Sequence, residues 1–152
     1  MTGPSVEDRL AIMELYARYS WALDTGDTDA YVALFTRDAE AEETQTGHVA
    51  RGHDEIREIV AFYHRNPDFP GHQHRIDTLV LDPDAQGRPD HWAARSYTLA
   101  SETPAEGDSK VYWSGWNDDV VAREDGVWRI RYRGIHPWRG AILDGFASRG
   151  TT

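Results

Sequence analysis

The chain has no cysteine and a single lysine, Lys110. Without cysteine it cannot form disulfides, thiolate nucleophiles, redox dithiols or zinc sites built on sulfur. Lys110 lies in a polar context at the start of an expected strand, which does not favour the desolvated amine of a Schiff-base enzyme. We therefore set these chemistries aside.

Basic side chains and long apolar runs are also scarce. Sixteen Lys and Arg stand against 26 Asp and Glu, for a formal net charge of −10. Such a surface repels phosphate backbones and anionic headgroups, so we expect neither a nucleic acid nor a membrane as partner. No apolar run approaches the ~18 residues of a membrane span, and no leader-like segment stands at the N-terminus. The sequence predicts a soluble, cytoplasmic protein.

What the chain does have is enough apolar sequence for one core. At 152 residues and 39% hydrophobic composition, it fits a single domain that can enclose a pocket. No repeat, low-complexity tract or linker interrupts it. We expect one domain over residues 1–152, with a core of about residues 5–138 and a C-terminal tail, 139–152, that frays at its end.

Helical spacing of apolar residues predicts three helices, over residues 6–23, 28–35 and 54–64. Ser5, with Asp8 three residues later, can cap the first of them. Its apolar stripe is expected to comprise Val6, Leu10, Ile12, Met13, Leu15, Tyr16, Tyr19 and Leu23.

Turn-forming residues divide the rest of the chain into strands. Four strands are expected over residues 72–81, 92–102, 111–122 and 127–136, and two short ones within residues 39–51. Helices followed by antiparallel strands indicate an α+β fold, in which the sheet curls around the first helix.

Two histidines on one strand are candidates for proton transfer. His72 and His74 alternate and so project to one face. The residues expected beside them on that face are Ile76, Thr78 and Val80. A neutral imidazole can move a proton near pH 7 if a carboxylate orients it, and Asp24, an acid with no capping role at a helix C-terminus, is the candidate. Spacing alone leaves open that Asp24 is an ordinary turn residue and that each histidine is a surface or strand residue.

Six segments spread over residues 5–138 carry a wider pattern. They are residues 11–19 (AIMELYARY), 23–27 (LDTGD), 34–39 (LFTRDA), 51–56 (RGHDEI), 74–80 (HRIDTLV) and 126–130 (GVWRI). Together they resemble the nuclear transport factor 2-like superfamily, specifically its polyketide-cyclase-like (SnoaL-like) branch. The resemblance implies a cone-shaped, curved antiparallel sheet wrapped around N-terminal helices, a cystatin-like α+β barrel with an apolar cavity.

Within that superfamily the pattern is similar to bile-acid dehydratase, hexachlorocyclohexane dehydrochlorinase and, more distantly, scytalone dehydratase. The resemblance places a catalytic base on His74, its partner on Asp24, a hydrogen-bond donor on Tyr19 and a cation on Arg133. It implies cofactor-independent elimination from a small hydrophobic polycyclic, aromatic or terpenoid substrate. Cyclisation or isomerisation by the same dyad is one alternative. A non-catalytic ligand-binding or oxygenase-associated subunit is another.

Geometry sets two conditions on these assignments. Arg133 has the parity of Arg129 and Arg131, so only a bulge turns it inward with the apolar side of its strand. Tyr19 and Asp24 lie about 140° apart around an ideal helix, and they converge on one ligand only if Asp24 already lies in the turn beyond the helix.

The many aromatic residues are expected mainly in the core, and some of them around the ligand. The set comprises Tyr16, Trp21, Trp92, Tyr97, Trp113, Trp116, Trp128 and Tyr132. Of these we expect Tyr16 and Trp113, together with Asn117, to contact a substrate.

No metal or other cofactor is expected, because Asp24 accounts for His74 without one. The alternative is a metal held by His72, His74 and a third ligand, His91 or His136. From its relatives we expect a homo-oligomer, a trimer or a dimer, formed through the outer face of the sheet.

Overall fold

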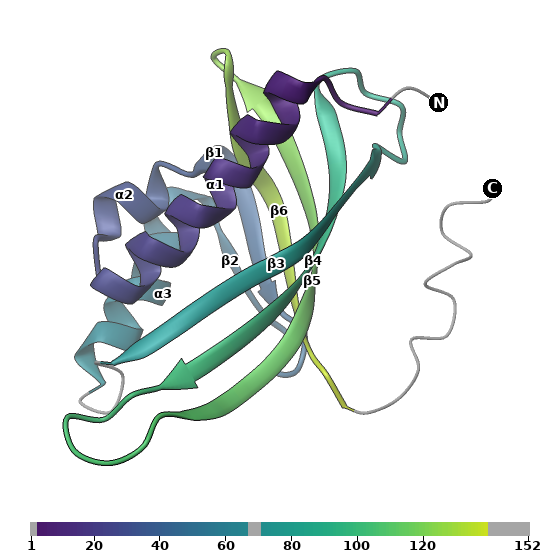
Figure 1. Ribbon diagram of the computed structural model, residues 1–152. Helices are drawn as coiled ribbons and strands as arrows, with labels where there is room; N and C mark the ends of the chain where they lie inside the picture. Colours follow the sequence, from purple (N-terminus) through teal and green to yellow (C-terminus); the bar gives the residue numbers. More distant parts are fainter. Residues whose placement is uncertain (1–2, 67–70, 140–152) are drawn as a thin grey trace.

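The computed structural model describes residues 3–66 and 71–139, and it confirms the α+β fold (Figure 1). The helices are α1 (Val6–Thr25), α2 (Thr28–Val32) and α3 (Gly52–Arg65). The strands are β1 (Phe35–Glu43), β2 (His48–Arg51), β3 (His72–Pro83), β4 (His91–Glu102), β5 (Lys110–Glu124) and β6 (Val127–Pro137). The tail expected after the core lies outside the described residues except for residue 139.

One six-stranded sheet has the order β2-β1-β6-β5-β4-β3. Strands β3 to β6 form the expected antiparallel meander. Strand β1 runs parallel to β6, so the sheet is not antiparallel throughout. The sheet is curved and open, with β2 and β3 at its edges, and the three helices lie on one side of it (Figure 1).

Helix α1 begins and ends where local chemistry dictates. The Ser5 hydroxyl accepts a hydrogen bond from the Asp8 N–H at 3.0 Å, which caps the first turn. Gly26 ends the helix in the left-handed conformation, with φ of 72°. Between these caps, α1 packs against β3 and β6, while α3 packs against β1, β2 and α2.

The buried face of α1 is narrower than the sequence predicts. It consists of Ile12, Leu15, Tyr16, Tyr19, Ala22 and Leu23. Val6, Leu10 and Met13 are exposed, because they lie on a neighbouring stripe and one sheet buries only one stripe of a helix. Two aromatic residues expected in the core, Trp21 and Tyr97, are also exposed.

The second helix is shorter than predicted. It ends at Val32, and Phe35 opens strand β1. The reason is a distant partner: the Ile130 N–H donates to the Leu34 carbonyl at 2.8 Å, which draws this segment into the sheet. Apolar spacing over so few residues does not separate a helix from a strand.

The side of the sheet that faces α1 is less apolar than expected. Besides its aliphatic and aromatic residues it buries polar side chains, namely Ser96, Thr98, Asn117, Asp119 and Arg133. Among the described residues, no helix is long and apolar enough to cross a membrane.

Candidate active site

The end of α1 and the start of β3 meet through Asp24 and His74. One oxygen of Asp24, Oδ1, lies 2.6 Å from His74 Nδ1, and the other, Oδ2, accepts the His74 backbone N–H at 2.9 Å. Both side chains are largely buried, with 18% and 15% exposed. An ionised Asp24 favours the hydrogen of a neutral imidazole on Nδ1, which puts the basic lone pair on Nε2.

The glycine cap of α1 holds Asp24 in place. Gly26 lies against the His64 ring of α3, and His64 Nε2 lies 2.9 Å from the Leu23 carbonyl oxygen. Asp24 is still helical, since α1 continues to Thr25, and it contacts β3 through His74. The prediction that Asp24 lies in the turn beyond the helix is wrong, so a ligand shared with Tyr19 would have to contact His74 rather than Asp24 itself.

Substituting Gly26, the C-cap of α1, tests how tightly the end of this helix packs against His64. Gly26 and Gly47 have nearly equal φ, 72° and 73°, a conformation that costs an alanine roughly 1–2 kcal/mol. A Cβ at Gly26 would lie 2.7 Å from the His64 ring, whereas nothing lies within 4 Å at Gly47. We expect Gly26→Ala to lower the free energy of unfolding by about 1–3 kcal/mol more than Gly47→Ala, measured by urea denaturation. Equal losses would show that the His64 contact is loose.

A bulge in β3 decides which residues share the face of His74. Pairing with β4 shifts between Asp77 and Val80, and Thr78 has a left-handed φ of 54°. Before the bulge, pairing is regular, so His72, His74 and Ile76 share one face as expected. Beyond the bulge, however, Leu79 and Leu81 pack on the core while Thr78 and Val80 are exposed. The expected places of Thr78 and Val80 are therefore wrong by one residue.

A second bulge, in β6, turns Arg133 inward. Strand parity had required such a bulge for Arg133 to share the face of the apolar residues. Val120 pairs with Tyr132 but Val121 pairs with Ile130, so Arg131 is an extra residue in β6. Ile130 and Arg133 consequently share the interior face, and Arg133 is only 2% exposed. Its guanidinium lies over the Tyr19 ring, with Cζ 4.2 Å from the ring centroid.

Asp119 is a buried acid that the sequence did not single out. Its Oδ2 lies 2.7 Å from Arg133 Nη1 and accepts a hydrogen bond from the Tyr16 hydroxyl at 2.8 Å. Burial raises the pKa of the Asp119 carboxyl to about 6, although Arg133 and the Tyr16 hydrogen bond act to lower it. The available signal was its strand parity with Asn117 and Val121, which places Asp119 on the inward face.

Tyr31 is a second residue that the sequence placed only in a helix. Its hydroxyl donates to the Tyr19 hydroxyl oxygen at 3.0 Å, and both rings are buried. Burial raises the pKa of Tyr31 well above its usual value. Because Tyr19 accepts this hydrogen bond, its own hydrogen is directed to another acceptor.

The other expected substrate contacts lie in or near this interior. Asn117 is fully buried, and its side-chain amide donates to the Ser96 and Thr98 hydroxyls at 3.0 and 2.6 Å. Trp113 is half-buried, with its ring folded over Gly115, where a Cβ would lie 2.1 Å from the ring. The structure thus brings the residues together as two groups, the Asp24–His74 pair and a cluster that joins Tyr16, Tyr19 and Arg133.

The histidines considered as metal ligands have aromatic neighbours. His72 stacks on Tyr112 with ring centroids 4.4 Å apart, and His136 stacks on Trp116 at 3.9 Å. Within residues 3–66 and 71–139, no group of three or more histidine, aspartate or glutamate side chains is placed to hold a metal ion.

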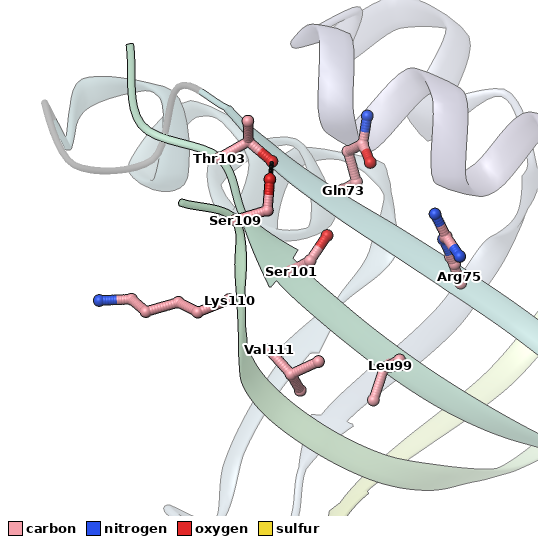
Figure 2. Close-up of a pocket in the computed structure, with 8 residues that line it drawn as sticks. All are labelled: Gln73, Arg75, Leu99, Ser101, Thr103, Ser109, Lys110 and Val111. Atoms are coloured by element: carbon pink, nitrogen blue, oxygen red, sulfur yellow. Dashed lines mark hydrogen bonds between the residues drawn. The ribbon is translucent and has the colours of Figure 1, made fainter. Parts of the chain in front are cut away.

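A pocket of about 240 Å³ lies on the outer face of the sheet (Figure 2). Gln73 and Arg75, which flank His74 on β3, line it with Leu99 and Ser101 of β4. Since neighbouring strand residues point to opposite faces, this pocket lies across the sheet from the dyad. Subunit contact through this outer face stays a prediction.

A curved sheet covered on one side by helices is the fold shared with solved structures described as cystatin-like and nuclear transport factor 2-like. A family model described as a SnoaL-like domain matches residues 4–134. The chain therefore belongs to the SnoaL-like domain family. None of the curated proteins matches it.

Solved structures share the fold. Rv3472, a protein of unknown function from Mycobacterium tuberculosis, is 26% identical with a TM-score of 0.74, covering 94% of this chain and 87% of its own. ActVI-ORFA from Streptomyces coelicolor is 23% identical with a TM-score of 0.74, covering 87% and 98%. A putative scytalone dehydratase from Novosphingobium aromaticivorans is 21% identical with a TM-score of 0.71, covering 88% and 86%. The last two likenesses concern the fold alone.

Proposed function

We propose that the protein is a cofactor-independent lyase in which His74 abstracts a proton from carbon and Asp24 orients and stabilises the imidazolium. The double contact of Asp24 with the ring and the backbone N–H of His74 carries this proposal. A carboxylate that only capped a strand would need the backbone contact alone. The second contact fixes the ring and favours its positive charge.

The reaction proposed is loss of water from a β-hydroxy carbonyl compound. His74 Nε2 takes the proton on the carbon beside the carbonyl, and the electron pair of that C–H bond forms an enolate. Collapse of the enolate forms the carbon–carbon double bond and breaks the C–O bond. The departing hydroxide takes the proton back from the imidazolium, so substrate becomes unsaturated product plus one water.

Tyr19 and Arg133 support the anionic stage in this proposal. The Tyr19 hydroxyl accepts from Tyr31 and donates to the carbonyl oxygen, where negative charge develops. The Arg133 cation against the Tyr19 ring adds positive potential to the same region. The neighbouring aromatic rings favour a small hydrophobic polycyclic or aromatic substrate.

A bicyclic β-hydroxy ketone of the tetralone type tests the proposal, because its loss of water yields a fluorescent naphthol. We expect the purified protein alone to form the naphthol and His74→Ala to lose that activity. Washout of deuterium from the carbon beside the carbonyl, without loss of water, would favour the isomerase or cyclase alternative. Binding of the ketone with neither reaction would favour the binding subunit and contradict the lyase.

Activity is expected to survive removal of metal ions. An aspartate–histidine pair moves a proton without a Lewis acid, so turnover after dialysis against EDTA should equal that of untreated protein. Elemental analysis of the same samples provides the control. A stoichiometric zinc or iron that is lost together with activity, and that substitution of His72 also removes, would overturn the metal-free mechanism.

A further inference from the structure

The interior holds an ion pair that stability alone does not explain. The Asp119 and Arg133 side chains are 0% and 2% exposed. Charged groups are almost never buried to this extent unless paired, and a well-packed apolar pair often stabilises a protein as well or better. A buried pair of this kind is therefore a candidate for a role beyond folding.

The geometry links the pair to the proposed donor. Oxygen Oδ2 of Asp119 bonds both Arg133 Nη1 and the Tyr16 hydroxyl, at 2.7 and 2.8 Å. The same guanidinium lies 4.2 Å from the Tyr19 ring centroid and 5.9 Å from that of Tyr16. One carboxylate oxygen thus fixes the cation that covers Tyr19. If that oxygen lost its charge, Arg133 would keep no anionic partner among the described ion pairs.

We propose that Asp119 is a positioning residue of the active site, which holds Arg133 against Tyr19. The inference rests on the proposed function, because Tyr19 is the hydrogen-bond donor of that reaction. Asp119 itself does not touch the substrate; it acts through Arg133.

The Asp119 carboxyl is expected to gain or lose its proton within the pH range in which proteins are ordinarily studied. Burial raises its pKa to about 6. The titratable groups that face it are Tyr16 of α1 and Arg133 of β6, while Asp118 of its own strand and Tyr132 of β6 lie near enough to interact with it electrostatically. Protonation of the carboxyl below this pKa removes the charge that holds Arg133, so the hold weakens as the pH falls through about 6.

Nitrogen-15 spectra of arginine-labelled protein test the hold directly, without a substrate. The signals of Arg133 are those missing from the Arg133→Lys variant. We expect slowly rotating, resolved Nη signals at about pH 7.5 that broaden as the pH falls through about 6. Asp119→Asn should show broadened signals at both pH values. Tyr16→Phe, which removes the other hydrogen bond of the same oxygen, should keep them resolved.

Kinetics with the tetralone-type ketone test the consequence for the reaction. In Asp119→Asn we expect kcat to fall about 10- to 100-fold while KM changes by less than about threefold, as misplacement of a group near the reacting atoms predicts. Resolved Arg133 signals in folded Asp119→Asn, or an unchanged kcat, would overturn the positioning role. If Asp119→Asn does not fold, wild-type signals that stay resolved down to about pH 5 would overturn it. The lyase proposal is tested separately: it would be contradicted if folded His74→Ala kept full turnover.

Discussion

His74→Ala is expected to lower turnover by at least ~10² to 10⁴-fold, because it removes the proposed general base. Asp24→Asn should cause a loss of the same order, since the amide keeps the size of the side chain but removes the charge that stabilises the imidazolium. Steady-state rates with the tetralone-type ketone measure both effects. Circular dichroism and thermal unfolding establish that each variant is folded.

The double variant separates a dyad from two independent residues. If Asp24 and His74 act as one unit, Asp24→Asn combined with His74→Ala should be little slower than the slower single variant. Losses that multiply would instead indicate separate roles. Unchanged turnover in the two folded single variants would refute the mechanism outright.

Asp119→Asn is expected to change how stability depends on pH. The pKa of the carboxyl is about 6 in the folded protein against an ordinary 3.8, so the folded state binds the proton more tightly than the unfolded state. The stabilisation from this proton is complete below about pH 4 and is lost as the pH rises through about 6, a change of about 3 kcal/mol. Asparagine does not titrate. The free energy of unfolding of Asp119→Asn should therefore improve relative to wild type by about this amount between pH 4 and 7.

Urea denaturation at a series of pH values measures that difference, and Arg133→Met provides the matched comparison. Arg133 acts to lower the pKa of Asp119, so its removal should raise that pKa further and move the loss of stability to higher pH. Parallel stability curves for wild type and Asp119→Asn would contradict a carboxyl that titrates near pH 6.

The regular elements could be predicted because their signals are local. The periodicity of α1 and α3, and the turns between β3 and β6, located these elements to within a few residues. The parallel pairing of β1 with β6 had no such signal, because it joins segments about 90 residues apart and depends on the rest of the sheet. The end of α2 at Val32 could not be predicted for the same reason, because it depends on the distant hydrogen bond from Ile130 to Leu34.

The candidate site likewise has residues that could be predicted from the sequence and residues that could not. Position in the chain made Asp24, His72 and His74 candidates, and the resemblance selected the pair of Asp24 with His74. The structure brings these two side chains together at 2.6 Å. The bulges at Thr78 and Arg131 could not be located from the sequence, since strand parity is counted along one chain and a bulge is defined by its partner. Asp119 was overlooked because its contact is with Arg133, which lies on the neighbouring strand and faces inward only beyond such a bulge.

The extra residue at Arg131 makes β6 tolerant of a change in strand length at this position. In a regular strand, deleting one residue turns every side chain beyond it to the opposite face. Deleting Arg131 would instead leave Ile130 opposite Val121 and Tyr132 opposite Val120, so the pairing with β5 would become regular. Arg133 would stay opposite Asp119, on the interior face. The bulge is therefore a place where β6 can lose a residue while the buried cation keeps its position.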